Sequence, residues 1–223
     1  MIFAFSCIML RRSVVSIILI LIAGCASVSH REMASQLVDR GINYADNGQY
    51  DLAIAEYDRA LQSSPAFASA FNYKGNAYFL KGQYDLAINE YNKAIDTDPD
   101  YLRAYSNMGY TYYHIGEYER AINEFNKALD KDPMYAKCYN KRGLAYFAKG
   151  ELDRAVHDYN KAIELDPALA HSYDNRGVVY LVTGEIEKAC ADFARACELG
   201  ECSTYHMLLN EGHYCQFDRL ASK

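Results

Sequence analysis

The sequence predicts an all-α solenoid of helix-turn-helix repeats, and the spacing of its prolines and glycines carries this prediction. The chain has four prolines, and each follows the previous one by 34 residues. Ten of its thirteen glycines fall on the same period, in two columns. A fixed period of this length indicates supersecondary units that stack and bury their apolar faces against their neighbours. The prolines are Pro65, Pro99, Pro133 and Pro167.

The period divides residues 34–203 into five repeats, each expected to form a first helix, a tight turn and a second helix. Glycine stands at position 8, tyrosine at position 11, alanine at positions 20 and 27, and Tyr or Phe at position 24. Positions 20, 24 and 27 have the spacing of one helix face, so they are expected in the core. The repeats are 34–67, 68–101, 102–135, 136–169 and 170–203.

The glycines and the proline have distinct expected roles. At position 8 the two helices are expected to approach too closely for a side chain, and the aromatic at position 24 fills the remaining space. The second glycine column is expected to end the first helix with a positive φ. Proline then closes the second helix and starts the next repeat. Most tyrosines in these columns are therefore interpreted as core residues.

This 34-residue pattern resembles the tetratricopeptide repeat (TPR) family. The resemblance covers the five repeats and implies a right-handed TPR superhelix whose first helices line a concave face. It also implies a non-catalytic role in binding other proteins. Residues 204–223 are expected to form a C-terminal cap, with a short helix, and a tail that follows it.

The N-terminus has the layout of an export signal, with Arg11 and Arg12 before an uncharged stretch. The stretch 13–24 would span about 18 Å as a helix, which is short of the ~30 Å hydrocarbon core of a membrane. Residues 22–25, Ile-Ala-Gly-Cys, resemble the bacterial lipobox. This resemblance implies a signal peptide over 1–24, a lipid on Cys25 and a short tether over 25–33.

Ala26 follows the cysteine, which by resemblance favours the outer membrane, facing the periplasm, over the inner membrane. An ordinary secretory signal with an incidental cysteine is the alternative. Translation starts at Met1 or, as a tidier signal, at Met9.

The concave face of the repeats is the expected binding surface. One window resembles the clamp with which co-chaperone TPR domains hold a peptide's C-terminal carboxylate, at Asn72, Asn76, Asn107, Lys137 and Lys141. Four positions match, and Asn72 replaces a lysine. The alternative is that Asn and Lys are ordinary solvated residues there. The predicted groove contains Asn72, Asn76, Phe79, Arg103, Asn107, Tyr110, Tyr113, Lys137, Asn140, Lys141 and Phe147.

Composition and motifs argue against other functions. The chain has 29 acidic and 23 basic residues, so it lacks the basic signature of nucleic-acid binding. It contains no phosphate-cradling glycine loop, no His-Glu-x-x-His and no nucleophile elbow. We therefore expect no enzyme, no cofactor and no small-molecule substrate. The predicted function is a scaffold, tethered to the membrane by lipid, that binds envelope proteins or peptides.

Cysteines cluster near the C-terminus. Cys202 and Cys215 flank the expected cap, and a disulfide between them is predicted. Cys190 and Cys197 stand in aliphatic columns and are interpreted as small buried residues. The second candidate function is a lipid-anchored module whose cysteine-rich end binds metal or does thiol redox chemistry. Since the spacing of Cys197, Cys202, His206, His213 and Cys215 matches no standard zinc pattern, no metal site is predicted. The third candidate function is self-assembly through the exposed ends of the solenoid.

Overall fold

The computed structural model describes residues 30–204, 206 and 215, and the chain forms two compact units, 1–99 and 100–223. The described residues contain helices and no strand, so the all-α prediction is confirmed. The predicted signal peptide, the lipidation site Cys25 and most of the C-terminal cap lie outside the described residues. No helix in the described part has both the length and the apolar character needed to cross a bilayer.

The described part of the first unit, residues 30–99, consists of two helical pairs. Residues 30–46 are helical and precede α2 (Tyr50–Ser63), which is followed by α3 (Ala68–Leu80) and α4 (Tyr84–Thr97). α3 packs against both α2 and α4.

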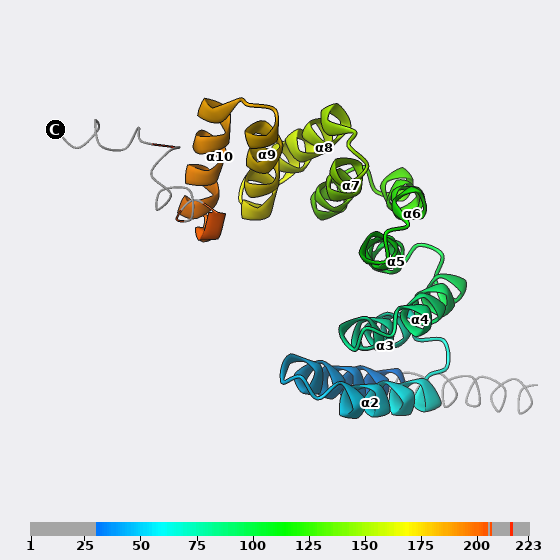
Figure 1. The fold of residues 1–223 in the computed structure, drawn as a ribbon. Helices are drawn as coiled ribbons and strands as arrows, with labels where there is room; N and C mark the ends of the chain where they lie inside the picture. Colours follow the sequence, from blue (N-terminus) through cyan, green and yellow to red (C-terminus); the bar gives the residue numbers. More distant parts are fainter. Residues whose placement is uncertain (1–29, 205, 207–214, 216–223) are drawn as a thin grey trace, which may run out of the picture. The chain divides into compact units, whose positions relative to one another are not determined.

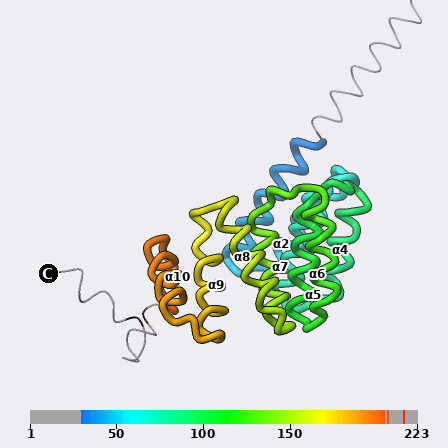
Figure 2. Tube along the Cα trace, turned by 90° about the horizontal axis from the view of Figure 1, so that it is seen from above, coloured from blue at the N-terminus to red at the C-terminus, as the bar shows by residue number. Residues whose placement is uncertain are grey.

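The second unit contains three further pairs, shown in Figure 1. α7 contacts both α5 and α9, whereas α6 and α8 each pack on the pair partner and on the next first helix. The first helices of the pairs therefore form a common layer. Figure 2 shows the successive pairs following one another toward α10. The helices are α5 (Leu102–His114), α6 (Tyr118–Lys131), α7 (Ala136–Ala148), α8 (Leu152–Leu165), α9 (Ala170–Val182) and α10 (Ile186–Glu198).

The position-8 glycines lie against the position-24 aromatics, as predicted. A Cβ on Gly143 would lie 2.6 Å from Cε1 of Tyr159, and one on Gly109 would lie 2.8 Å from Cε1 of Phe125. Real Cβ atoms do not approach other atoms so closely, so only glycine fits. The ring of Phe125 is fully buried in the space that the glycine leaves. This close approach holds each pair of helices together.

The second glycine column ends the first helices, again as predicted. Gly150, for example, has a φ of +78°, and its four counterparts have φ values between +73° and +82°. A side chain would be strained in this left-handed conformation even though the space around Gly150 is open.

The position-11 tyrosines are only partly buried, unlike the aromatics at position 24. In the second unit the rings of these tyrosines form cation–π contacts with arginine or lysine side chains. Tyr146, for example, lies between the guanidinium groups of Arg142 and Arg154, whose central carbons are 5.7 Å and 5.6 Å from the ring centroid. The prediction that these tyrosines are core residues is thus too simple, because one part of each ring supports a charged group at the surface.

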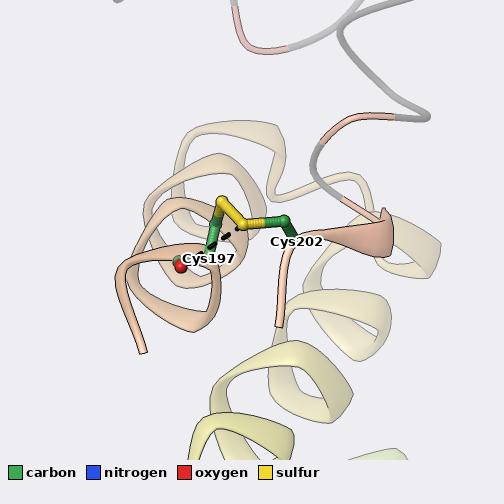
Figure 3. Close-up of a disulfide and its surroundings, with 2 residues drawn as sticks. All are labelled: Cys197 and Cys202. Carbon is green, nitrogen blue, oxygen red and sulfur yellow. Dashed lines mark hydrogen bonds between the residues drawn. A yellow bond between two sulfur atoms is a disulfide. The ribbon is translucent and has the colours of Figure 1, made fainter. Parts of the chain in front are cut away.

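The predicted Cys202–Cys215 disulfide is wrong. Cys202 is bonded to Cys197, and Cys215 is bonded to Cys190. Figure 3 shows the first bond at the end of α10, where Cys202 Sγ also lies 3.3 Å from the carbonyl oxygen of Cys197. The chain turns back directly after α10, so Cys202 meets the nearest cysteine of that helix. Cys190 and Cys197 are therefore cross-linked residues rather than simple apolar ones.

Candidate functional site

Lys141 is the centre of the candidate site on the second unit. It lies on α7 and faces α5, where its ammonium is 3.3 Å from Ser106 Oγ and 3.4 Å from Asn107 Oδ1. The same group lies 5.0 Å from the centroid of the Tyr110 ring. Both hydrogen bonds are longer than is usual for N–H···O contacts. The charge is thus surrounded by neutral groups that hold it loosely.

No carboxylate in the described part of the chain pairs with this ammonium, which sets Lys141 apart from most cations of the array. Burial, the largest effect, and the nearby charge of Lys137 together lower the pKa of Lys141 to about 8. Burial disfavours the charged form of a lysine unless an anion compensates for the lost water. An anionic ligand that reaches this position would supply the missing compensation.

The neighbouring cysteine takes no part in this chemistry. Cys138 is a free thiol with no exposed surface, and its sulfur lies 3.6 Å from the backbone oxygen of Phe125. Burial raises the pKa of Cys138 to about 12. The thiol therefore stays neutral at physiological pH and acts as a packing residue.

Asn140 links the next two first helices. Its Oδ1 accepts hydrogen bonds from Ser172 Oγ at 3.1 Å and from Asn175 Nδ2 at 3.0 Å. Its carbonyl oxygen is thus engaged with α9, which leaves the NH₂ group as the part that a ligand would meet. Asn140 therefore lines the site, and its hydrogen bonds to α9 fix the orientation of its side chain.

Aromatic rings border the lysine along α5. The Tyr110 and Tyr113 rings stack with centroids 6.0 Å apart, and His114 meets Tyr110 edge-on at 4.5 Å. Burial lowers the pKa of His114 and raises the pKa of Tyr113, so both are neutral at pH 7. These rings form a rigid apolar wall, which suits an extended peptide because rings offer contact area at low entropic cost.

The other predicted groove residues have different surroundings. Arg103 and Lys137 are exposed. Phe147 is partly buried and packs against the cluster of Ala155, Tyr159 and Val179.

The first unit holds the three remaining predicted residues, all on α3. Asn72 is only 2% exposed, and Val38 at the same repeat position is also buried. Asn76 Oδ1 accepts a hydrogen bond from the Tyr91 hydroxyl at 2.8 Å, and the Phe79 ring lies 5.6 Å from that of Tyr84. Asn72 therefore serves packing. A clamp extending from α3 to α7 stays a prediction, whereas the structure brings Asn107, Tyr110 and Lys141 together.

Sequence reasoning missed a set of ion pairs that join the first and second helices of the repeats. Position 7 carries a cation in four repeats, and position 23 carries an acid. Arg142 donates to both carboxylate oxygens of Asp158, at 2.7 Å and 2.8 Å. The signal was available, because a cation precedes an acid by 16 residues in these repeats. Cys197, Cys202 and His206, whose spacing in the sequence predicted no metal site, have ligand atoms within 4.8 Å of one another.

Comparison with known families covers most of the array. Models described as "TPR repeat" match residues 41–82, 75–116, 109–150 and 143–184, and one described as "Tetratricopeptide repeat" matches 170–199. No curated protein matches the chain by sequence.

Solved structures share the fold. The crystal structure of MamA is 28% identical, with a TM-score of 0.60 over 74% of this chain and 96% of MamA. The pilF protein of Pseudomonas aeruginosa is 20% identical, with a TM-score of 0.71 over 77% of this chain and 78% of its own. YrrB, "a TPR protein with an unusual peptide-binding site", is 20% identical, with a TM-score of 0.57 over 78% of this chain and 90% of its own.

Proposed function

The chain belongs to the tetratricopeptide repeat family, and from this premise we propose that it is a non-catalytic scaffold that binds the carboxylate of a partner peptide between α5 and α7. TPR proteins serve as protein–protein interaction scaffolds. The observation that carries the proposal is the partly buried ammonium of Lys141, which pairs with no carboxylate in the described part of the chain. The carboxylate is either a C-terminus or an acidic side chain.

The site has the parts that such a ligand requires. Lys141 supplies charge, Asn107 and the Asn140 NH₂ group supply polar contacts, and the stacked ring of Tyr110 supplies apolar surface. Charge-assisted hydrogen bonds are stronger than neutral ones, so a carboxylate would shorten the loose contacts of the ammonium. The exposed Lys137 lies one helical turn before Lys141 and adds positive charge at the entrance.

Peptide titration tests this site. Peptides that end in a free carboxylate and their amidated forms would be titrated by calorimetry against wild type and Lys141→Met, which keeps the length of the apolar stem. The expected result is a preference of the wild type for the free acid of about tenfold, the size of one charge-assisted hydrogen bond, and its loss in the variant.

Lys161→Met on α8 is the matched control, because that lysine pairs with Glu164 near the surface. Its affinity should equal that of wild type. Acidic internal peptides form the second arm and separate a side-chain carboxylate from a C-terminus. Equal affinity of Lys141→Met and wild type for every acidic peptide would remove the proposal.

We further propose that lipid on Cys25 anchors this scaffold to the bacterial envelope, facing the periplasm. The support is the Ile-Ala-Gly-Cys sequence after an apolar stretch that is too short to span a bilayer. Stable anchoring requires two or more acyl chains, which lipid modification of this cysteine would provide. Metabolic labelling with a clickable fatty acid should mark wild type in the membrane fraction and leave Cys25→Ser unlabelled. A cleaved, unlabelled and soluble wild type would refute the anchor.

A further inference from the structure

The two disulfides of the second unit differ in their surroundings. Cys190 and Cys215 are buried in an apolar cluster with Ala189 and Phe193. Cys197 and Cys202 are only partly buried, and the exposed imidazole of His206 lies beside them. A thiol reductant and a metal ion can therefore reach the second disulfide, while the first is buried and has no such ligand group beside it among the described residues.

The backbone explains why three ligand types meet at the end of α10. The backbone N–H of His206 donates to the carbonyl oxygen of Cys202 at 3.0 Å, so the two residues are one helical turn apart. Side chains at i and i+4 lie on the same side of a helix. Cys197 belongs to the last turn of α10, and Gly200, with a φ of +102°, reverses the chain between the two cysteines.

We propose that reduction of the Cys197–Cys202 disulfide creates a metal site in which Cys197, Cys202 and His206 bind one Zn²⁺ ion. The three ligand atoms lie within 4.8 Å of one another. Tetrahedral zinc with bonds of about 2.3 Å to sulfur and about 2.0 Å to nitrogen places its ligand atoms about 3.5–3.8 Å apart. A small separation of the two sulfurs after reduction reaches that geometry. Two thiolates and an imidazole favour zinc over calcium or magnesium, which prefer oxygen ligands.

The reaction balances in two steps. A dithiol reductant delivers two electrons and two protons, which breaks the S–S bond, leaves two thiols and converts the reductant to its own disulfide. Zn²⁺ then displaces the two thiol protons, forms two Zn–S bonds and one Zn–N bond, and retains a fourth position for water or a partner's ligand. The cross-link and the metal site are therefore mutually exclusive states of the same residues.

Metal titration of the full chain tests the proposal. Protein reduced with a phosphine would be titrated with Zn²⁺ and, separately, with Co²⁺ as a visible probe. The reduced chain should bind one Zn²⁺, and Co²⁺ should give the absorption of a tetrahedral thiolate site. The oxidised chain should bind at least tenfold more weakly. A reduced chain that binds no Zn²⁺ would overturn the proposal.

Variants assign the ligands. Cys197→Ser and Cys202→Ser should each abolish the cobalt–thiolate absorption, and His206→Ala should weaken Zn²⁺ binding at least tenfold. His206→Ala leaves the disulfide intact, so circular dichroism of its oxidised form controls for folding. Cys138→Ala removes the remaining described thiol and should bind as wild type does. Undiminished zinc binding by His206→Ala, or by the double variant Cys197→Ser/Cys202→Ser, would also overturn the assignment.

Discussion

Residues 141 and 142 are neighbours on α7, yet their cationic groups have opposite surroundings. Arg142 forms two hydrogen bonds to the Asp158 carboxylate and a third to Asn126 Oδ1 at 2.6 Å. Although burial opposes it, the hydrogen bonds and the charge of Asp158 raise the pKa of Arg142. Lys141 has no carboxylate partner among the residues that the structure describes, and burial lowers its pKa to about 8. One helix thus stabilises the array with one cation and leaves the next one available for a ligand.

The repeats also differ in whether position 7 holds a cation that pairs with the acid at position 23. Arg176 in the fifth repeat reproduces the Arg142 arrangement, with two 2.7 Å bonds to Asp192 and a contact to Asn160. In the third repeat Met108 takes the arginine's place, while the acid is kept as Glu124, which is 8% exposed. Its Oε1 binds Lys127 at 2.6 Å, but no described group hydrogen-bonds its Oε2. The fold therefore forms without the position-7 cation in one repeat. The four experiments below measure how much these charged groups contribute to the stability of the protein.

The largest effect is expected for Arg142→Ala. This change leaves the Asp158 carboxylate, which is 1% exposed, without its partner. Breaking a buried ion pair on one side costs about 3–5 kcal/mol. Urea denaturation should report this loss. Arg154→Ala also removes an arginine from the Tyr146 ring, but it is exposed, and it should cost less than about 1 kcal/mol. Equal losses in both variants would contradict the comparison.

A smaller effect of opposite sign is expected for Lys141→Met. Removing a partly buried and unpaired charge should stabilise the protein by on the order of 1–2 kcal/mol at pH 7. The pKa of Lys141 is about 8 in the folded state and 10.5 as the ordinary value, so the unfolded state binds more protons between these pH values. Wild-type stability should therefore rise across that window, and the advantage of the variant should shrink. Thermal unfolding at pH 7, 8, 9 and 10 measures this trend, which a constant difference would exclude.

Rebuilding the missing ion pair between positions 7 and 23 of the third repeat is expected to stabilise the protein by about 1 kcal/mol. The double variant Met108→Arg/Glu124→Asp copies the residues of the fourth and fifth repeats. Tyr105 and Tyr112 occupy the repeat positions of the tyrosines that stack on Arg142. The acid is already buried, so the new hydrogen bonds need not offset its desolvation. Denaturation of the double variant and of Glu124→Asp alone isolates the arginine, and a less stable double variant would refute the analogy.

The smallest effect is expected for Glu124→Gln. Its ion pair with Lys127 involves a lysine side chain that is 55% exposed, and such pairs contribute little. The free energy of unfolding should change by less than about 0.5 kcal/mol. The equivalent Asp158→Asn should cost several times more, because it weakens a bidentate pair. Similar values for the two substitutions would show that repeats three and four do not differ.

The repeating core could be predicted from the sequence because it depends on local spacing. Each position-8 glycine meets the aromatic 16 residues later, and this relation is the same in all five repeats. The ion pairs of positions 7 and 23 follow the same spacing and could have been found. A search that follows only the glycine, aromatic, alanine and proline columns does not reveal them.

The candidate site and the disulfides could not be predicted from the 34-residue period, because they depend on residues that differ between repeats or lie outside them. The isolation of Lys141 results from which residues α5 happens to present, here Ser106 and Asn107 rather than an acid. The partner of Cys202 depends on the direction of the chain after Gly200, outside the repeat pattern. Asn72 stands at the clamp position where it replaces a lysine, and it is buried. Position within a repeat therefore predicts packing better than accessibility.

The bond from Arg142 to Asn126 has a consequence for the order of folding. The arginine belongs to the fourth repeat and the asparagine to the third, and Arg176 makes the equivalent contact with Asn160 of the fourth. Each of these arginines reaches its complete set of partners only when the preceding repeat is already in place. In a nearest-neighbour description of the array, this adds coupling between successive repeats. Hydrogen exchange should then find repeats three, four and five opening together rather than one at a time.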